Sequence, residues 1–252
     1  MPTVNSLLEL FKEAYPFEGA LSFDNVGLIC GRKDKEVHKV LVTLDVTSSV
    51  IQEAKELGAE LIVSHHPVVF RELKRITDES YTGLLLLSLI ENGIASIALH
   101  TNFDCAEEGN NALLARALGA KEFTVIEDGF ATEFDLDGEM DAEEFAARVK
   151  AALGETAIRK IGSGKVKKVI ASCGAGISES LIFRARENGA VIVTADVKHN
   201  YAEMAKDLGV RLVEPTHYAS EWAFACEIKK FLAEKAAGVA CFVSRHNTNP
   251  YG

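Results

Sequence analysis

The strongest constraint on the fold is an alternation of short, β-branched runs with helical stretches along most of the chain. An apolar run at residues 40–44 is followed by a helical stretch that Gly58 ends, and then by a second apolar run at residues 61–63. This order of elements is typical of βαβ units, in which neighbouring strands run parallel. The same order returns from residue 166 onward. We therefore predict an α/β protein with mostly parallel sheets flanked by helices.

The same patterns give approximate positions for the other elements. Residues 124–133 are typical of a strand and a turn, and residues 244–252 are expected to be loosely ordered. The remaining helices are expected at residues 82–91, 141–153, 178–187, 201–208 and 217–235, and the remaining strands at 94–99, 166–171, 191–194 and 210–213.

A weak internal repeat indicates how the chain is divided. VIQEAKELGAELIV, from residue 50, aligns with LIFRARENGAVIVT, from residue 181, at an offset of 181 − 50 = 131. Either the chain contains a duplicated α/β unit, or both stretches are ordinary helix–glycine–strand connections. With 252 residues there is room for two related lobes. We predict an N-terminal lobe at 1–126 and a C-terminal lobe at 127–252, and the two lobes can interleave.

Charge and composition exclude several classes of function. The chain has 27 Lys and Arg against 37 Asp and Glu, a net charge of −10, which disfavours non-specific binding to nucleic acid or anionic membranes. It lacks an apolar stretch of the roughly 20 residues that a membrane-spanning helix needs. The first residues are typical of an amphipathic helix, not of a signal peptide. Five scattered cysteines, never spaced as CxxC, favour reduced thiols and a cytoplasmic protein.

Three polar clusters each follow a predicted strand. SHHPVVF contains His65 and His66, HTNFD contains His100 and Asp104, and HYASE begins with His217. Ligands of open α/β sheets bind at the carboxyl ends of the strands. We therefore expect these three clusters to lie at the same edge, although they are distant in sequence.

The residue types in these clusters suit a metal centre. His217 and Glu221 are four residues apart at a predicted helix start, so both side chains share one face. Pro67 favours an extended backbone at His66, which turns the adjacent imidazole of His65 in another direction. Imidazole and carboxylate ligands suit zinc, iron, manganese or nickel, and the ligand count exceeds the three of a typical mononuclear site. A pair of divalent metal ions fits the clusters better.

Each cluster also has an ordinary structural interpretation. HHP can form a turn, HxxxE can be a solvated helix end, and HTNFD can connect a strand to a helix with an aspartate cap. The glycine-rich turn at 172–178 and the basic run at 159–168 could hold an anion, although a tight turn and a solvated loop explain them better. The three clusters together, each after a strand, favour the metal site.

The chain resembles the GTP cyclohydrolase I type 2 homolog family, also called the NGG-interacting-factor-three-like dinuclear metal proteins. The resemblance rests on SFDNVGLICG, VLVTLDVT, SHHPVVF, HTNFD, TADVKHN and HYASE, in this order along nearly the whole chain. It implies a ring-shaped homohexamer without the middle insertion of some members, with metal pairs at strand ends between the lobes. The ligands that it implies are His65, His66, Asp104, His217 and Glu221, of which Glu221 bridges the two ions.

The resemblance also implies a function and secondary residues. Asp45, His100 and His199 match positions near the metals, and His100 or His199 is a candidate for proton transfer. The implied activity is metal-dependent hydrolysis, in the form of opening of the guanine ring of GTP with loss of formate. This resemblance implies a small-molecule substrate, with a nucleotide as the candidate, and no direct binding to nucleic acid is expected. The alternative is a metal-binding regulatory or protein-interaction protein without turnover. Phe23 and Thr216 depart from the family pattern, where tryptophan and glycine are expected.

Overall fold

The computed structural model describes residues 1–251, and these form two compact units of mixed α/β structure. Unit 1 comprises Met1–Phe103 and Phe224–Thr248, and unit 2 comprises Asp104–Ala223 and Asn249–Gly252, of which Gly252 lies outside the described residues. The lobes expected at 1–126 and 127–252 stay a prediction. None of the described helices is long and apolar enough to cross a lipid bilayer.

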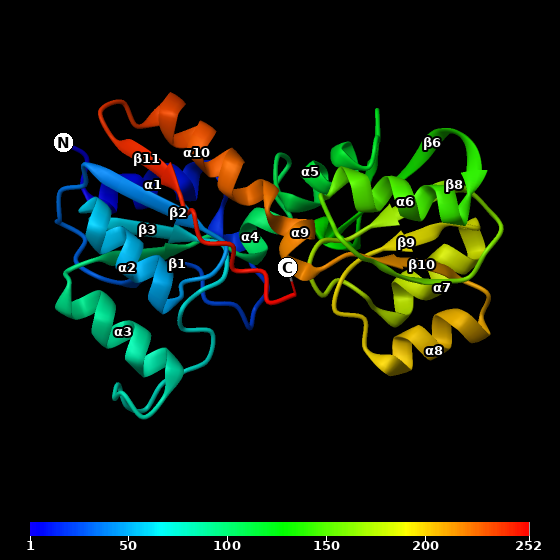
Figure 1. Cartoon of the computed structure of the whole chain (residues 1–252). Helices are drawn as coiled ribbons and strands as arrows, with labels where there is room; N and C mark the ends of the chain where they lie inside the picture. Colours follow the sequence, from blue (N-terminus) through cyan, green and yellow to red (C-terminus); the bar gives the residue numbers. More distant parts are fainter. Residues whose placement is uncertain (252) are drawn as a thin grey trace. The chain divides into compact units, whose positions relative to one another are not determined.

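Unit 1 is built on a five-stranded sheet in the order β1-β4-β3-β2-β11 (Figure 1). The strands β11, β2, β3 and β4 are parallel, and β1 pairs with β4 in the antiparallel direction. The expected strands around residues 40–44, 61–63 and 94–99 are confirmed. The strands are β1 (Gly27–Cys30), β2 (Lys39–Thr43), β3 (Leu61–Ser64), β4 (Ala95–Ala98) and β11 (Ala240–Val243).

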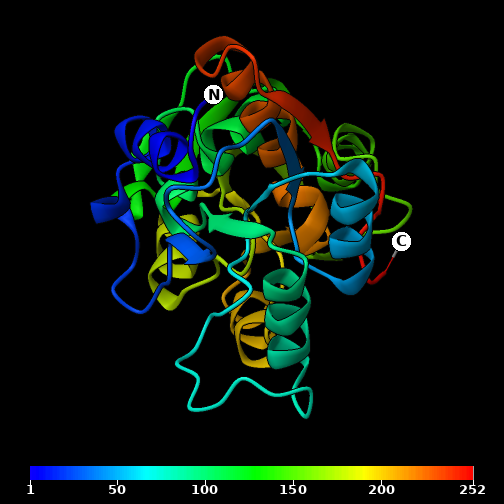
Figure 2. The ribbon, with the colours of Figure 1, turned by 90° about the vertical axis from the view of Figure 1, so that its left-hand side faces the viewer.

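Helices cover both faces of this sheet. α1 and α10 pack together on one face, where the rings of Phe11 and Phe231 stack at 5.6 Å, and α2 and α3 cover the other (Figure 1). Figure 2 shows that the long connection between β3 and α3 projects beyond the start of α3. The helices are α1 (Val4–Ala14), α2 (Ser48–Leu57), α3 (Tyr81–Glu91), α4 (Thr101–Asp104) and α10 (Ala223–Lys235), with a 3₁₀ turn, η1, at Phe17–Gly19.

Unit 2 contains a six-stranded sheet in the order β5-β6-β8-β9-β10-β7. Its centre, β8-β9-β10, is parallel, as expected, but β5, β6 and β7 add antiparallel pairs around it. The strands are β5 (Thr124–Ile126), β6 (Ala131–Asp141), β7 (Arg159–Ile161), β8 (Lys165–Ala171), β9 (Val191–Val193) and β10 (Arg211–Glu214).

The helices of unit 2 also lie on both faces of the sheet. α5 and α6 share one apolar cluster with β8, and α7 and α8 share another with the opposite side of the same strands (Figure 1). The bounds are α5 (Asn110–Ala117), η2 (Glu127–Gly129), α6 (Ala142–Ala152), α7 (Glu179–Asn188), α8 (His199–Asp207) and α9 (His217–Glu221).

One expectation for the C-terminal part is wrong. The helix expected at residues 217–235 is interrupted at Trp222 and forms α9 and α10 instead. The tail has no helix or strand at residues 244–251, and hydrogen bonds from Ser244 to Glu53 and from Thr248 to Asp45 hold its first part to unit 1. Local composition could not reveal these bonds, since the partners lie about 200 residues away.

Candidate metal centre

Three histidines gather at the carboxyl ends of two neighbouring strands in unit 1. His65 and His66 follow β3 directly, and His100 follows β4. One ring nitrogen from each of the three lies within 4.8 Å of the others, a spacing that can hold a metal ion. The side chain of His66 is 27% exposed and that of His100 is 16% exposed, whereas His65 is fully buried.

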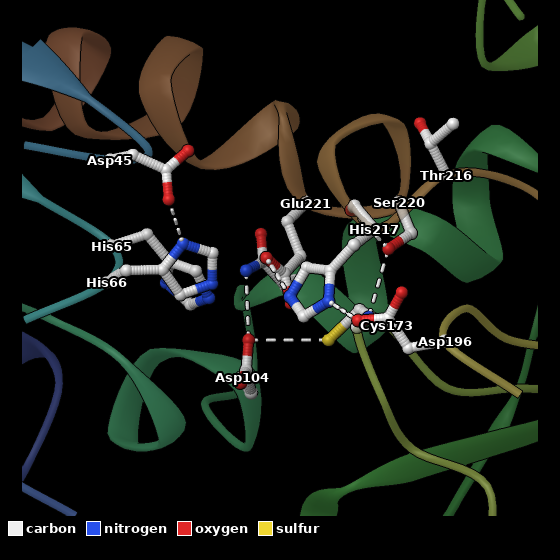
Figure 3. A network of polar contacts seen from close by, with 12 residues as sticks. Asp45, His65, His66, Asp104, Cys173, Asp196, Thr216, His217, Ser220 and Glu221 are labelled. Atoms are coloured by element: carbon white, nitrogen blue, oxygen red, sulfur yellow. Dashed lines mark hydrogen bonds and ion pairs between the residues drawn. The ribbon is translucent and has the colours of Figure 1, made fainter. Parts of the chain in front are cut away.

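Hydrogen bonds determine which nitrogen of His65 and His66 faces outward. Nδ1 of His65 lies 2.8 Å from the carbonyl oxygen of Leu99, and Nδ1 of His66 lies 2.8 Å from Oδ1 of Asp45 (Figure 3). A carbonyl and an ionised carboxylate only accept hydrogen bonds, so Nδ1 of each ring carries the proton and donates it. Nε2 of each ring then carries the lone pair that could bind a metal, and metal-ligating histidines are usually held in this way.

His100 is oriented in the same way by a buried carboxylate. Its Nδ1 lies 2.8 Å from Oδ1 of Asp24, whose other oxygen accepts bonds from the backbone N–H and the hydroxyl of Thr101. Burial alone would raise the pKa of Asp24, but the bonds from His100 and Thr101 more than offset it and lower the pKa to about 2. Asp24 therefore stays ionised and keeps the His100 ring fixed.

In unit 2, His217 and Glu221 occupy one face of the short helix α9. Thr216 caps this helix, with its hydroxyl accepting a hydrogen bond from the backbone N–H of Ala219. Nδ1 of His217 lies 2.7 Å from Oδ2 of Asp196, so this ring also has its proton on Nδ1 (Figure 3). Asp196 itself has a left-handed backbone conformation, with φ +50°, of the kind that collects at functional sites.

The other ring nitrogen of His217 faces the carboxylate of Glu221. Nε2 of His217 and Oε2 of Glu221 are both shielded from solvent and lie 3.0 Å apart. With the proton on Nδ1 alone, both atoms present lone pairs, and a metal ion between them would make this distance favourable; a second proton on Nε2 would do the same by forming an ion pair. Two ligands at right angles, each about 2.1 Å from one ion, would themselves lie about 3 Å apart. This part of the site fits a metal ion.

A glycine, Gly174, makes room for the close approach of the His217 and Glu221 side chains to the turn after β8. Gly174, in the turn after β8, has φ +55°, and a Cβ there would overlap the carboxylate of Glu221 and lie 3.1 Å from Nε2 of His217. Its N–H donates to Oγ of Ser220 at 2.9 Å, which holds the turn against α9. The glycine-rich turn at 172–178 therefore serves as a support for these two side chains.

Asp104 is held beside this support by an amide and a thiol. Its Oδ1 accepts hydrogen bonds from Nδ2 of Asn110 at 2.9 Å and from Sγ of Cys173 at 3.3 Å (Figure 3). One carboxylate oxygen of Asp104 lies within 4.8 Å of one of Glu221. Burial raises the pKa of the Cys173 thiol well above its usual value, and the charges of Asp104 and Glu221 raise it further. Cys173 is therefore a neutral donor to Asp104.

A pocket of about 290 Å³ in unit 2 adjoins His217. Its walls include the apolar residues Ile158 and Pro215 together with Asp196 and Tyr251. It is also lined by Arg159, whose guanidinium pairs with the buried carboxylate of Glu214. Such a mixture of apolar walls and a few polar groups is typical of a small-molecule site.

The predicted residues thus form one group in each unit. Unit 1 brings together His65, His66 and His100, and unit 2 brings together Asp104, His217 and Glu221. Asp45 lies behind His66, as the resemblance implied for a residue near the metals. His199 is an exposed residue at the start of α8.

Sequence reasoning missed three of the groups that hold these side chains. Asp24 and Asp196 lie in the SFDN and TADV motifs, but no spacing rule links either one to its histidine, which is 76 or 21 residues away. The carbonyl of Leu99 carries no side-chain signal at all. Thr216 replaces the expected glycine and caps α9.

Comparison with known proteins identifies a family. The model of the family described as Duf34/NIF3 (NGG1p interacting factor 3) matches residues 2–250. The GTP cyclohydrolase 1 type 2 homolog of Clostridium perfringens is 31% identical over 259 residues, covering 98% of both chains. The GTP cyclohydrolase 1 type 2 of Helicobacter pylori (strain J99) is 32% identical over 239 residues, covering 92% of both chains.

Solved structures share the fold over the whole chain. A hypothetical protein of Staphylococcus aureus superposes with a TM-score of 0.91 and 29% identity, covering 100% of this chain and 99% of that one. Reduced HcgD from Methanocaldococcus jannaschii superposes with a TM-score of 0.85 and 26% identity, covering 97% and 98%.

Proposed function

The chain belongs to the Duf34/NIF3 (NGG1p interacting factor 3) family, and from this we propose that it is a hydrolase dependent on two divalent metal ions. The proposed ligands are His65, His66, Asp104, His217 and Glu221. The carboxylate of Glu221 is the proposed bridge between the two ions. Zinc, iron and manganese all suit this set of imidazoles and carboxylates.

One observation carries the proposal. The Nδ1 atoms of His65, His66 and His217 all bond to oxygens that only accept hydrogen bonds, so each ring has its proton on Nδ1 and offers Nε2 as a ligand. A neutral imidazole carries one proton, so placing it on Nδ1 leaves Nε2 as the ligand atom, and metal-binding histidines are usually held by such a bond. The 3.0 Å approach of Nε2 of His217 to Glu221 gives independent support.

We propose a purine nucleoside triphosphate as the substrate, with GTP as the first candidate, because the two curated relatives carry the name GTP cyclohydrolase 1 type 2. The bound ions would supply activated water, one molecule to open the imidazole ring of the guanine and a second to hydrolyse the resulting formamide and release formate. The pocket beside His217 would hold part of the nucleotide, and the guanidinium of Arg159 would attract its phosphates. His100, whose ring centroid lies 5.1 Å from that of His65, is the proposed proton carrier, and His199 is the second candidate.

The test combines metal analysis with an assay of formate release from GTP. We expect two metal equivalents per chain and turnover that a chelator abolishes and added metal restores. Glu221→Gln, which keeps the size but removes the charge, and His66→Ala should each lose at least one equivalent and nearly all turnover. His38→Ala is the matched control, because His38 pairs with Glu60 on the surface of unit 1.

The same experiment addresses the alternative function. Two tightly bound metal ions without turnover of GTP, phosphoesters or cyclic amides would favour a regulatory or protein-interaction protein over an enzyme. Metal contents equal to wild type in both variants would contradict the ligand assignment itself. Assembly as a homohexamer and a cytoplasmic location stay predictions from the sequence.

A further inference from the structure

We propose that Thr248 is a positioning residue for His66: its hydroxyl holds Asp45, and Asp45 holds the imidazole with Nε2 turned outward. The hydroxyl of Thr248 donates to Oδ2 of Asp45 at 2.7 Å, and Nδ1 of His66 donates to Oδ1 of the same carboxylate at 2.8 Å. The expected effect on metal binding rests on the proposed function, whereas the orientation of His66 does not.

The C-terminal segment reaches Asp45 because of its strand pairing. β11 runs parallel to β2, with Val243 opposite Val42, so the residues after β11 emerge at the carboxyl end of β2. Asp45 lies at that same end, two residues after Thr43. The hydrogen bond from the backbone N–H of Ser244 to the carbonyl of Val42, at 2.8 Å, continues the pairing.

A buried carboxylate anchors the segment before it reaches Thr248. Glu53, in α2, is only 5% exposed and accepts hydrogen bonds from the hydroxyl of Ser244 at 2.7 Å and from the backbone N–H of Arg245 at 3.1 Å. The guanidinium of Arg245 also pairs with Glu56 at 2.8 Å. Because these bonds fix the backbone before Thr248, they restrict the position of its hydroxyl.

Asp45 needs such a partner to orient an imidazole. Its side chain is 39% exposed, so water can compete for its oxygens and the carboxylate can rotate about its χ2 torsion. A hydroxyl donating to Oδ2 leaves Oδ1 in a fixed position for Nδ1 of His66. The hydroxyl of Thr43 restrains the same residue from the other side, by donating to the carbonyl oxygen of Asp45 at 3.1 Å.

The same arrangement of threonine, aspartate and histidine occurs a second time in unit 1. The hydroxyl of Thr101 donates to Oδ2 of Asp24, and Oδ1 of Asp24 bonds to Nδ1 of His100. There the threonine is adjacent to its histidine in sequence, whereas Thr248 is 203 residues from Asp45. Two independent occurrences around one group of imidazoles indicate that the threonine hydroxyl is part of how these rings are held.

The test uses three variants and two readouts. Thr248→Val removes only the hydroxyl, Thr248→Ser retains it, and Thr3→Val makes the matched substitution at the threonine that caps α1. The first readout is the dissociation constant for Mn²⁺ or Zn²⁺, measured by competition with a chelator. The second is the tautomer of His66 in the metal-free protein, measured from ¹⁵N chemical shifts of the ring.

We expect Thr248→Val to weaken binding of the more weakly held ion about tenfold and to reduce the population of the Nδ1–H tautomer of His66. Thr248→Ser should restore both, and Thr3→Val should change thermal stability without moving either. A wild-type tautomer and a wild-type affinity in Thr248→Val would overturn the proposal, and so would equal losses in Thr3→Val. If the wild-type protein binds no metal, the proposed function fails while the tautomer still decides the role of Thr248.

Discussion

The two units share one succession of elements but place different chemistry at the ends of the strands. In unit 1 the order β2-α2-β3-α3-β4 forms the parallel part of the sheet, and in unit 2 the order β8-α7-β9-α8-β10 does the same. The first helix of each succession begins at a hydroxyl cap, Thr47 or Ser178, and ends at a left-handed glycine, Gly58 or Gly189. The likeness thus extends over five elements, well beyond the stretch in which the sequence repeat is visible.

The polar residues that follow the second strand of each succession differ in kind, whereas those that follow the third strand are alike. His65 and His66 follow β3, whereas Asp196 follows β9. After the third strand, His100 and Asp104 have the same four-residue spacing as His217 and Glu221. A common backbone therefore presents two imidazoles after the second strand of one succession and a carboxylate after the second strand of the other. The comparison shows that the shared backbone determines where candidate ligands lie, whereas the residue type at each position determines whether the ligand is an imidazole or a carboxylate.

The largest expected effect comes from Gly174→Ala, which should disturb the candidate ligands of unit 2 and leave those of unit 1 unchanged. The new Cβ would overlap the carboxylate of Glu221, and φ +55° is unfavourable for alanine. We expect a loss of about 3 kcal/mol in the free energy of unfolding and loss of metal binding by unit 2. Chemical denaturation and metal analysis measure the two effects.

Gly209→Ala is the matched control for that variant. Gly209 is also in unit 2 and has φ +70°, but a Cβ there would meet no atom within 4 Å. It should cost only the backbone strain of about 1 kcal/mol and leave metal binding unchanged. Equal metal contents in the two variants would mean that Gly174 does not support the site.

An intermediate effect is expected from Asp24→Asn, which tests the carboxylate behind His100 in unit 1. The pKa of Asp24 falls from 3.8 to about 2 on folding, so its contribution to stability is fully present above about pH 4 and is lost as the pH falls through 2. The difference in the free energy of unfolding between wild type and variant should shrink by about 2 kcal/mol between pH 5 and pH 2. Urea denaturation across this range measures it.

The control for Asp24→Asn is Asp34→Asn, at an exposed carboxylate of the same unit. Its effect on stability should be small at every pH in this range. A difference for Asp24→Asn that does not change with pH would show that the carboxylate acts through packing and not through its charge.

The smallest expected effect comes from the two glycines that end the equivalent helices α2 and α7, and it tests whether the two units are alike there. Gly58 and Gly189 end equivalent helices with φ +66° and +65°, and neither has a neighbour that would crowd a methyl group. Gly58→Ala and Gly189→Ala should each cost about 1 kcal/mol, because the strain is the same in both. Thermal denaturation of both variants should give matching shifts, and a clear inequality would argue against equivalent roles.

Much of the fold could be predicted from local patterns. The strands around residues 61–63 and 191–194 could be predicted because buried parallel strands are continuous apolar runs. The helix that precedes each of these strands could be predicted because Gly58 and Gly189 mark the helix ends. The antiparallel strands β1 and β7 and the edge strand β11 were missed, since short, half-exposed strands have no strong periodicity.

The sequence by itself determined that HHP, HTNFD and HYASE would follow strands and stand at carboxyl ends, because hydrophobic periodicity and chain order suffice for that. Only the tertiary structure decided which ring nitrogen each histidine offers. That choice depends on Leu99, Asp45, Asp24 and Asp196, and the partner on the far side of Asp45 is Thr248. Hydrogen bonds of this kind act over less than 3 Å between residues up to 203 positions apart, so no local pattern in the chain records them.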